Sequence, residues 1–482
     1  MSNAAVPTIA KTDAQVSDEI DSTYVANQLH ALRMHRLAPL REQGLTPAHT
    51  RTVTWVGDLQ QGDGGKGAMT DRLAARHQVV VRVQGGDNAG HTTVFRGEHG
   101  ADVVLKGHLL PSGMRHPGVF GILANGVLIN AESLSRELDE FEGHFPGSSQ
   151  RVFVSSRAHV ILPLHIAVDL RQEESRKGGA IGTTKRGIGP TNVSKINRMG
   201  LRVCDLARLD LVEQRIRDNV EFFGLAETEV ARNLAWVADF RDVLLSRAID
   251  SARLINDLVE TGHSVLFEGA QGPLIDLEHG IYPYVTTSPT TVHSVGSGSG
   301  FDVSRVKDRI GVLKVYQTMV GNGVFVSEDN GALGSRLRSE GNEFGTTTGR
   351  DRRCGWLDMP QARWAVEVNG FTSVVLTKLD VLDSFETVGL CVGYELDGEI
   401  VIQFGAEHSE LERATPIIQY FEGWQTSTKE LRSFADLPPQ ARAFVDAISD
   451  HLGREIAAVT VGPRDVNILL TETGLLSTAL AG

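Results

Sequence analysis

The chain has 482 residues, enough for about three domains of average size or for one large domain with appendages. With 41% hydrophobic and 22% charged residues, the composition is that of a folded globular protein and argues against wholesale disorder. The net charge is −13, so no overall basic field would draw the chain to nucleic acid. An anionic ligand would therefore have to be held by local groups.

The cysteine content, the hydropathy and the first residues together favour a cytoplasmic protein. The three cysteines (Cys204, Cys354 and Cys391) lie far apart, without metal-type spacing and too few for a disulfide framework, which indicates a reducing compartment. No stretch reaches the roughly 18 uninterrupted apolar residues that a membrane span requires. The first 50 residues carry several acids and no apolar signal core, which argues against a targeting peptide.

Residues 1–50 are predicted to be an N-terminal appendage to a domain formed by residues 51–482. They start with small polar residues, continue with a helical pattern over 24–41 and end at a Gly-Leu-Thr-Pro break. This pattern favours a flexible tail, and an arm that stabilises an oligomer is the alternative.

A strand–loop–helix pattern begins at Thr52. Residues 52–57 are predicted to form a buried strand, 68–77 a helix and 79–84 a second strand, and a glycine-rich loop follows each strand. Such a βαβ unit places its loops at the carboxyl ends of the strands. We expect later strands to begin at Ser264, Ile310, Ser373 and Ala457, and helical stretches over 206–223 and 231–261. The pattern predicts an α/β fold with a mostly parallel central sheet, flanking helices and insertions, among them the polar segment 177–200.

The first glycine-rich loop contains the sequence Gly62-Asp63-Gly64-Gly65-Lys66-Gly67. Glycines let backbone N–H groups approach phosphate oxygens, the following helix N-terminus adds positive potential, and Lys66 adds a full charge. The loop is not a Walker A motif, because Gly67 stands where that motif has Ser or Thr. The sequence therefore favours a phosphate site over an ordinary glycine turn.

Asp63 is the unusual residue of this loop. A carboxylate repels phosphate unless it binds a bridging cation or removes a proton from the substrate. For an isolated residue, a solvated aspartate in a turn is the more common interpretation.

The second glycine-rich loop, residues 85–92, contains His91. Histidine can act as a general acid or donate to a developing anion near neutral pH. Most single histidines have no such role, but two glycine-rich loops after neighbouring strands strengthen the functional interpretation of both.

Three further motifs indicate the binding of a base and of anions. Residues 377–380 (Thr-Lys-Leu-Asp) end a predicted strand, where the aspartate could accept two hydrogen bonds from guanine; a strand-end ion pair is an equally good interpretation. Residues 345–353 combine hydroxyls with guanidinium groups, which suits recognition of small carboxylates or phosphates, with a solvated basic turn as the alternative. Residues 182–190 have a similar anion-binding composition.

Together these motifs resemble the adenylosuccinate synthetase family over nearly all of residues 51–482. The shared motifs, in the family's order, are QGDGGKG, QGGDNAGHT, GTTKRGIGP, FEGAQG with IDLEHGIYPYVTTS, GNEFGTTTGRDRRCGWLD, and TKLDVLD. The resemblance implies the family's fold, with a GTPase-like nucleotide site, and its reaction in purine biosynthesis. GTP phosphorylates the 6-oxygen of IMP, and the amine of aspartate then displaces the phosphorylated oxygen. The products are adenylosuccinate, GDP and phosphate.

The resemblance also implies roles for single residues. Asp63 would be the base that removes the N1 proton and a ligand of Mg²⁺, with the carbonyl of Gly90 also on the metal. His91 would be the acid that assists phosphoryl transfer. Lys66 and the loop amides would hold the transferring phosphoryl group, and Gln271 would read the purine base.

The substrate sites follow from the same resemblance. The expected IMP set is Asp63, Lys66, Asn88, Ala89, Gly90, His91, Thr184, Arg198, Gln271, Thr286 and Arg350. The expected GTP set is Gly62, Gly64, Gly65, Lys66, Gly67, Gly90, His91, Thr92, Arg352, Lys378, Leu379, Asp380, Thr460, Val461 and Gly462. The expected aspartate set is Thr346, Thr347, Thr348, Gly349, Arg350 and Arg352. Arg198 would come from the partner subunit of a homodimer.

The chain departs from the family's usual pattern at several positions. Gln61 replaces Trp, Gly64 replaces Glu, Ala68 replaces Lys, Asp87 replaces His, Asp351 lies within the arginine loop, and the segment 461–465 is one residue short. Two alternatives stay open: a paralogue that performs this chemistry on another 6-oxopurine nucleotide, and a GTP-binding regulator without catalysis. Retention of both a base and an acid beside the phosphates argues against the regulator.

Overall fold

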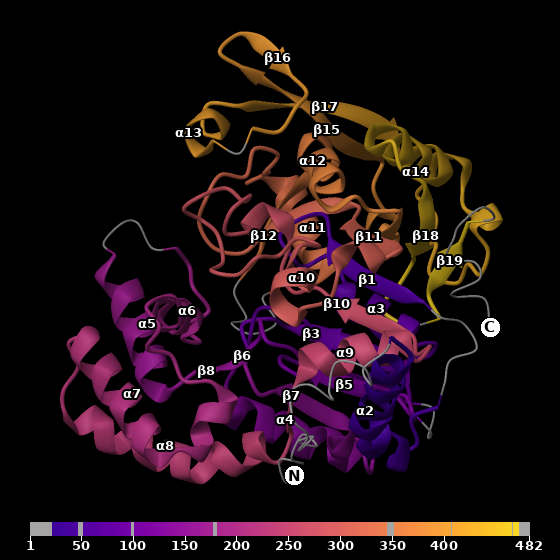
Figure 1. Cartoon of the computed structure of the whole chain (residues 1–482). Coiled ribbons are helices and arrows are strands. Elements are labelled where there is room, and N and C mark those ends of the chain that lie inside the picture. Colours follow the sequence, from indigo (N-terminus) through magenta and orange to yellow (C-terminus); the bar gives the residue numbers. More distant parts are fainter. Residues whose placement is uncertain are drawn as a thin grey trace.

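The structure is a computed structural model that describes residues 22–46, 52–97, 101–176, 181–344, 351–405, 407–464 and 466–471. Within these residues ten strands form one sheet in the order β19-β18-β14-β11-β1-β10-β2-β5-β7-β9 (Figure 1). All neighbours are parallel except β18 and β19. The strands are β1 (Val53–Asp58), β2 (Val79–Arg82), β5 (Phe120–Leu123), β7 (Val152–Ser155), β9 (Ala248–Ile249), β10 (Val265–Glu268), β11 (Asp308–Lys314), β14 (Ser373–Thr377), β18 (Ile456–Thr460) and β19 (Ile468–Leu470). The predicted α/β fold with a mostly parallel sheet is confirmed.

Alternate residues of the central strands face two layers of helices. Trp55 and Val81 pack in one apolar cluster with residues of α2, α9, α12 and α14, whereas Val56 and Val80 pack with α3. Because both faces are covered, the central strands read as continuous apolar runs rather than as alternating ones. The helices are α2 (Ser22–Glu42), α3 (Lys66–Ala74), α4 (Ala131–His144), α5 (Pro163–Ser175), α6 (Ile188–Ile196), α7 (Leu209–Phe222), α8 (Thr228–Leu245), α9 (Ser251–Glu260), α10 (Ser294–Ser299), α11 (Ala332–Gly341), α12 (Met359–Asn369), α13 (His408–Leu411) and α14 (Pro439–Leu452).

The predicted strands are confirmed as β1, β2, β10, β11, β14 and β18, and the helix expected over 206–223 is α7. The continuous helix expected over 231–261 is wrong, because α8 ends at Leu245 and α9 begins at Ser251. Between them Ala248 and Ile249 pair with β7 at the sheet edge, and the side chain of Asp250 accepts a hydrogen bond from the backbone N–H of Arg253. The edge pairing and the N-cap together break the helix.

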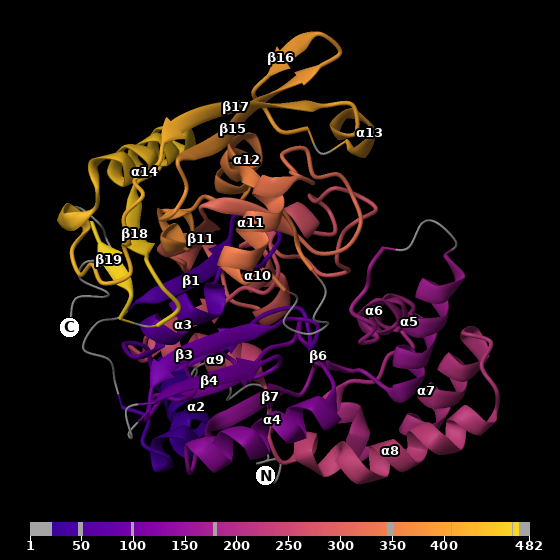
Figure 2. The same ribbon diagram turned by 180° about the vertical axis from the view of Figure 1, so that it is seen from behind.

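A smaller sheet lies beyond the carboxyl ends of β1, β11 and β14, and Figure 2 shows it from behind. Its strands are β12 (Tyr316–Met319), β13 (Arg353–Asp358), β15 (Thr387–Leu396), β16 (Glu399–Val401) and β17 (Thr415–Glu422). Two short pairs complete the described strands: β3 (His91–Arg96) with β4 (Asp102–Gly107), and β6 (Leu128–Ile129) with β8 (His159–Val160). Because only Val315 separates β11 from β12, the end of the large sheet is tied directly to the small one.

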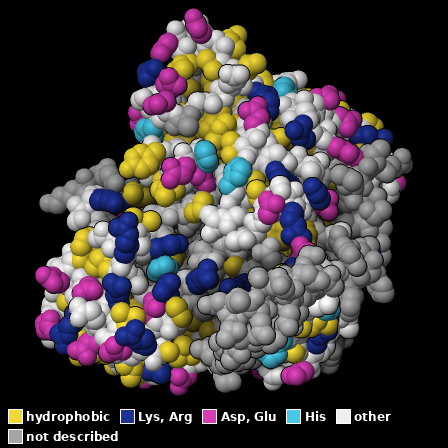
Figure 3. Space-filling view, viewed as in Figure 1, with side chains coloured by type: hydrophobic (Ala, Val, Ile, Leu, Met, Phe, Trp, Pro, Cys, Tyr) yellow, Lys and Arg dark blue, Asp and Glu magenta, His cyan; other side chains and the backbone are white. Residues whose placement is uncertain are grey.

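Helices α5, α6, α7 and α8 form a lobe at the side of the sheet (Figures 1 and 2). Lys and Arg side chains gather on this lobe in the space-filling view (Figure 3). The segment 185–202, which includes α6, carries five basic residues and no acidic one. This segment therefore presents local positive charge in a protein of net charge −13.

The described part of the N-terminal region, residues 22–46, forms α2 and packs against α9. Leu37 and Leu40 are buried in the main apolar cluster, and Arg33 and Arg36 form ion pairs with Asp257 of α9, at 3.3 and 2.5 Å. The helix expected over 24–41 is present, and residues 1–21 and 47–50 lie outside the described residues. Among the described helices, none is long and apolar enough to cross a membrane.

The packing of α2 gives a prediction for stability. Leu37→Ala should lower the free energy of unfolding by about 2–5 kcal/mol, because the methyl groups removed are fully buried. Leu29→Ala on the same helix is the matched control, since Leu29 is 46% exposed and should change stability by less than about 0.5 kcal/mol. Urea unfolding of both variants measures the difference, and equally small effects would show that α2 does not pack on α9 in solution.

Candidate functional site

Three loops meet where the adjacent strands β1, β10 and β2 end. They are the first glycine-rich loop after β1, the segment 269–272 after β10, and the second glycine-rich loop after β2. A Cβ at Gly62 would lie 2.4 Å from the Cα of Gln271, and one at Gly85 would lie 3.2 Å from the side-chain oxygen of Gln271. Gln271 therefore lies between the two glycine-rich loops, at the edge of a parallel sheet where α/β proteins usually bind ligands.

The first glycine-rich loop turns sharply into α3. Gly65, with a φ of +99°, precedes the helix, and Lys66 is the first helical residue. The ammonium of Lys66 is buried and contacts the carboxylate of Asp58 at 3.0 Å and the carbonyl of Gly62 at 2.9 Å. The hydroxyl of Thr377 donates to the carbonyl of Gly64 at 2.7 Å, which ties the loop to the end of β14.

Asp63 lies at the tip of this loop with its two carboxylate oxygens in different surroundings. Oδ2 is 3.0 Å from the ammonium of Lys314 and 3.5 Å from the guanidinium of Arg352, and it accepts a hydrogen bond from Thr318. Burial opposes ionisation, but Lys314 and Arg352 outweigh it and hold the pKa of Asp63 below its usual value. Oδ1 is buried without a hydrogen-bond partner in the described residues.

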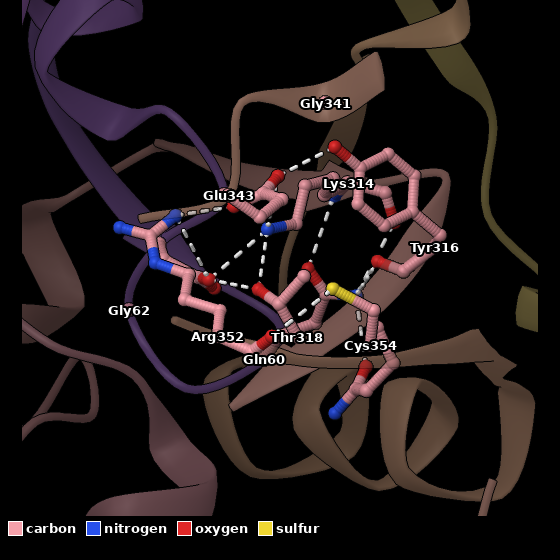
Figure 4. Close-up of polar contacts among 12 residues, drawn as sticks. Gln60, Gly62, Lys314, Tyr316, Thr318, Gly341, Glu343, Arg352 and Cys354 are labelled. Atoms are coloured by element: carbon pink, nitrogen blue, oxygen red, sulfur yellow. Dashed lines mark hydrogen bonds and ion pairs between the residues drawn. The ribbon is translucent and has the colours of Figure 1, made fainter. Parts of the chain in front are cut away.

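Glu343 contacts the cations that surround Asp63, and Figure 4 shows it beside Lys314 and Arg352. Its fully buried carboxylate lies 3.1 Å from Lys314, 2.6 Å from Lys378 and 2.5 Å from Arg352, and it accepts a hydrogen bond from Tyr316. Burial favours the neutral acid, yet Lys314, Lys378 and Arg352 hold the pKa of Glu343 far below its usual value. Neither Glu343 nor Lys314 was predicted from the sequence, although Glu343 lies in the motif GNEFGTTTGRDRRCGWLD.

His91 begins β3 and packs against the first turn of α3, where a Cβ at Gly67 would lie 2.9 Å from the Cβ of His91. Its Nδ1 is 3.1 Å from a carboxylate oxygen of Glu268, which also accepts hydrogen bonds from the hydroxyl and the backbone N–H of Ser112, at 2.6 and 2.9 Å. Burial and the charges of Arg82 and Lys66 lower the pKa of His91 well below its usual value, so the imidazole is neutral at neutral pH. Glu268 was not predicted from the sequence either.

Several polar atoms of these residues have no partner. In the described part of the chain, buried atoms without a hydrogen-bond partner include Oδ1 of Asp63, Nε2 of His91, both amide atoms of Gln271 and Nε of Arg352. Burial of a polar group without a partner is unfavourable, so several such groups in one place favour a bound ligand. Those of Asp63, His91 and Gln271 lie on the loops that meet at one sheet edge, and Arg352 lies 3.5 Å from Asp63, which indicates a polar ligand site there.

The structure brings the residues of the expected guanine site together at the ends of β14 and β18. The backbone N–H of Lys378 donates to the hydroxyl of Thr460 at 3.1 Å, and Lys378 has a φ of +61°. Asp380 is half-buried, and burial raises the pKa of its carboxyl although Lys429 partly opposes this. At Gly462 a Cβ would lie 2.8 Å from the side chain of Asn467, so the loop after β18 is closely packed.

Four residues of the expected IMP set are spread over several segments. Asn88, Thr184 and Thr286 are half-buried, and the side-chain oxygen of Asn88 accepts a hydrogen bond from the backbone N–H of Gly86. Arg198 is exposed and follows α6 in the helical lobe, rather than lying on one of the three loops. The residues expected to bind aspartate lie outside the described part of the chain at 346–350, and Arg352 is their described member.

Two departures from the family pattern have a structural explanation. The carboxylate of Asp87 accepts hydrogen bonds from the side chains of Asn130 and Ser133, both at 2.9 Å, so α4 fixes its orientation. Burial raises the pKa of Asp87 despite these contacts. Ala68 is exposed on α3, where a shorter side chain disturbs no packing.

Comparisons with known proteins agree on the family. The sequence profile of adenylosuccinate synthetase matches residues 56–469. The adenylosuccinate synthetase of Desulforamulus reducens is 39% identical over 87% of this chain and 99% of its own, and that of Thermobifida fusca is 41% identical over 84% and 95%. The fully ligated Plasmodium falciparum adenylosuccinate synthetase superposes with a TM-score of 0.82 at 33% identity, covering 88% of this chain and 100% of its own.

A more distant structure shares the fold alone. Cyanophage S-2L succinoaminodeoxyadenylate synthetase, bound to dGMP and dATP, superposes with a TM-score of 0.56 at 22% identity over 90% of this chain and 99% of its own. The profile match and the relatives near 40% identity cover most of the chain, including all three loops at the sheet edge. The chain belongs to the adenylosuccinate synthetase family.

Proposed function

We propose that this protein is a GTP-dependent ligase that joins L-aspartate to the 6-position of IMP through a 6-phosphoryl intermediate, giving adenylosuccinate, GDP and phosphate. Family membership supports the reaction. The observation that carries it is the cluster of unpartnered atoms of Asp63, His91 and Gln271 beside the buried ammonium of Lys66. These residues supply a base, a proton donor, an amide for a purine and a cation for phosphate.

Asp63 is proposed to remove the N1 proton of IMP. Its lowered pKa keeps the carboxylate ionised at neutral pH, and Oδ1 has lone pairs without a partner in the described residues. Loss of the proton makes the 6-oxygen a better nucleophile for the γ-phosphorus of GTP. Lys314 and Thr318 hold Oδ2, so the carboxylate is oriented before substrate arrives.

Lys66 and His91 are proposed to stabilise the transferring phosphoryl group. Lys66 lies at the start of α3, where the ammonium charge and the helix N-terminus both attract phosphate oxygens. In the free protein His91 is neutral, and a phosphoryl group close to Nε2 would raise its pKa by favouring the imidazolium. The imidazolium can then donate to the 6-oxygen as it leaves.

Arg352 is proposed to bind a carboxylate of aspartate together with the segment 346–350. In the free protein its guanidinium is held by Glu343 at 2.5 Å, and Nε has no partner within the described residues. A guanidinium whose position is already fixed loses less conformational entropy when it binds a carboxylate.

Mg²⁺ is proposed to bind at Asp63 and the backbone carbonyl of Gly90. The unpartnered Oδ1 of Asp63 fits this ion, which prefers oxygen ligands and commonly takes only one or two carboxylates from the protein. The described residues contain no group of three or more side chains suited to a metal, which agrees with further ligands coming from phosphate oxygens and water. When bound there, Mg²⁺ would neutralise charge on the phosphates of GTP.

The acceptor is tested by a substrate panel. GTP, Mg²⁺ and aspartate are held constant, purine nucleoside monophosphates are varied, and GDP release is followed. IMP should support the highest kcat/KM. A higher value for another 6-oxopurine nucleotide would replace IMP as the acceptor, and no turnover with any nucleotide would favour a non-catalytic GTP-binding protein.

The proposed base gives the first prediction of this function. Asp63→Ala should leave a folded protein with almost no turnover, because a proton acceptor and a metal ligand are both lost. Steady-state rates with saturating substrates measure the effect, and Asp302→Ala, on an exposed turn elsewhere, is the control. A variant that keeps more than about a tenth of the wild-type rate, an effect below roughly 1.4 kcal/mol, would contradict the assignment.

The phosphoryl donor gives the second. If Asp380 accepts the two donors on the edge of guanine, GTP should support turnover far better than ATP. Asp380→Asn should raise the KM for GTP, since an amide presents a donor where guanine also presents one. Comparison of kcat/KM for GTP and ATP in both proteins measures this, and equal wild-type values for the two donors would refute the guanine site.

Assembly gives the third. We expect a homodimer in which Arg198 reaches the IMP phosphate of the partner subunit. Arg198→Leu should raise the KM for IMP more than that for GTP, because the lost contact is charge-assisted. Mixing Arg198→Leu with Asp63→Ala subunits should restore part of the activity, since a heterodimer then has one site with both residues intact. No recovery despite demonstrated subunit exchange would place Arg198 within its own chain's site or outside any site.

A further inference from the structure

Asp58, the last residue of β1, lies inside the first glycine-rich loop with its side chain fully buried. Its Oδ1 accepts hydrogen bonds from the backbone N–H groups of Gln60 at 2.8 Å and Gly62 at 3.2 Å. Its Oδ2 accepts from the backbone N–H of Gly64 at 2.9 Å and from the ammonium of Lys66 at 3.0 Å. Four donors from one short segment therefore converge on a single carboxylate.

This donor set is the kind that a phosphate-binding loop presents to phosphate, namely backbone amides together with a lysine. Here the amides of alternate residues 60, 62 and 64 turn to a carboxylate from the chain itself. The ammonium of Lys66 also donates to the carbonyl of Gly62 at 2.9 Å. Two of its three N–H groups are thus used, and these two contacts fix the direction of the third.

We propose that Asp58 is a positioning residue of the first glycine-rich loop. It fixes the backbone amides of residues 60, 62 and 64 and directs the remaining N–H of Lys66 at the transferring phosphoryl group. This inference rests on the proposed function for the identity of the phosphoryl donor. Asp58 need not touch a substrate, and acts through Lys66 and the loop backbone.

Gly64 is the second observation that supports this role. A Cβ at position 64 would lie 2.8 Å from Oδ2 of Asp58 and 3.0 Å from the backbone carbonyl of Val312, so no side chain fits there while Asp58 is present. Gly64 stands where adenylosuccinate synthetases usually carry Glu. The presence of Asp58 therefore requires a glycine at position 64. A side chain at position 64 would point into the space that the Asp58 carboxylate occupies.

Asp58 also offsets the charge of Lys66. The side chain of Lys66 is only 3% exposed, and a buried ammonium without a counter-ion is strongly unfavourable. In the absence of nucleotide, Asp58 supplies that counter-ion. It also keeps Lys66 in one orientation, so that phosphate meets an ordered cation rather than one that has to be ordered on binding.

Asp58→Asn is the most direct test, because it keeps the shape and removes the charge. The amide oxygen can still accept from Gln60 and Gly62, but its NH₂ group would face the N–H of Gly64 and the ammonium of Lys66, so donor would meet donor. We expect kcat to fall by about tenfold or more and the affinity for GTP, measured by calorimetry, to weaken by about tenfold. The KM for aspartate should stay within about twofold, because that site lies on another segment.

Moving the carboxylate from position 58 to position 64 gives a second test. A purely structural role of Asp58 predicts no recovery of activity in it. Asp58→Gly alone should lose activity because Lys66 loses its counter-ion, and Gly64→Glu alone should lose activity because the new side chain collides with Asp58. In the double variant Asp58→Gly/Gly64→Glu, the new carboxylate projects into the space that the old one vacates. Its kcat should exceed that of either single variant by about tenfold.

The outcomes separate this proposal from the proposed function. Turnover of IMP by the wild-type protein tests the proposed function. GTP binding by the Asp58 variants tests the role of Asp58 in the loop, and it does not depend on which nucleotide is the acceptor. If Asp58→Asn keeps wild-type kcat and GTP affinity and only lowers the melting temperature, Asp58 has a structural role alone and the proposal fails. A double variant that folds and is no more active than Asp58→Gly also overturns it. Asp58→Asn decides the question if the glycine variants do not fold.

Discussion

The buried carboxylate of Glu343 is the contact on which the rest of the site depends. It joins Lys314 from the end of the large sheet, Lys378 from the guanine motif and Arg352 from the aspartate motif. Removal of one partner from such a buried cluster leaves charges uncompensated, which is far more costly than the loss of a surface ion pair. The position of each cation is therefore coupled to the other two. One side chain thus holds together three separate segments of the chain.

The strands and the candidate reactive residues could be picked out from the sequence because both leave local signals. Buried strands appear as apolar runs, and Asp63, Lys66 and His91 lie in glycine-rich loops directly after such runs. The partners of these residues leave no local signal. Lys314 contacts Asp63 across 251 residues of chain, so composition cannot show which cation meets which carboxylate. The contact between Glu268 and His91 could not be predicted for the same reason, because it exists only after β10 and β2 pair.

The break between α8 and α9 shows the same limit at the level of secondary structure. The segment 231–261 has a helical pattern throughout, and the two-residue strand β9 forms only because β7 offers it a free edge. Asp250 could be recognised as an N-cap residue from the sequence, but a cap in the middle of a helical pattern is weak evidence by itself. Tertiary pairing decided the outcome there, as it did for the charge pairs of the site.

The pairing of charges in the free protein explains how a site rich in cations can be stable without its anionic substrates. Lys66 is paired with Asp58, Lys314 with Asp63 and Glu343, and Arg352 with Glu343, so no ammonium or guanidinium of this group is buried alone. A phosphate or a carboxylate that binds here adds to an existing ion pair, or shares its donors, rather than having to assemble a group of mobile cations. In the described part of the chain, the atoms of this site without partners are side-chain oxygen and nitrogen atoms of Asp63, His91, Gln271 and Arg352. The protein thus fixes the positions of the charged groups, while the unpartnered atoms can still form hydrogen bonds with substrates. This arrangement favours a fast reaction, because few groups have to move when the substrates bind.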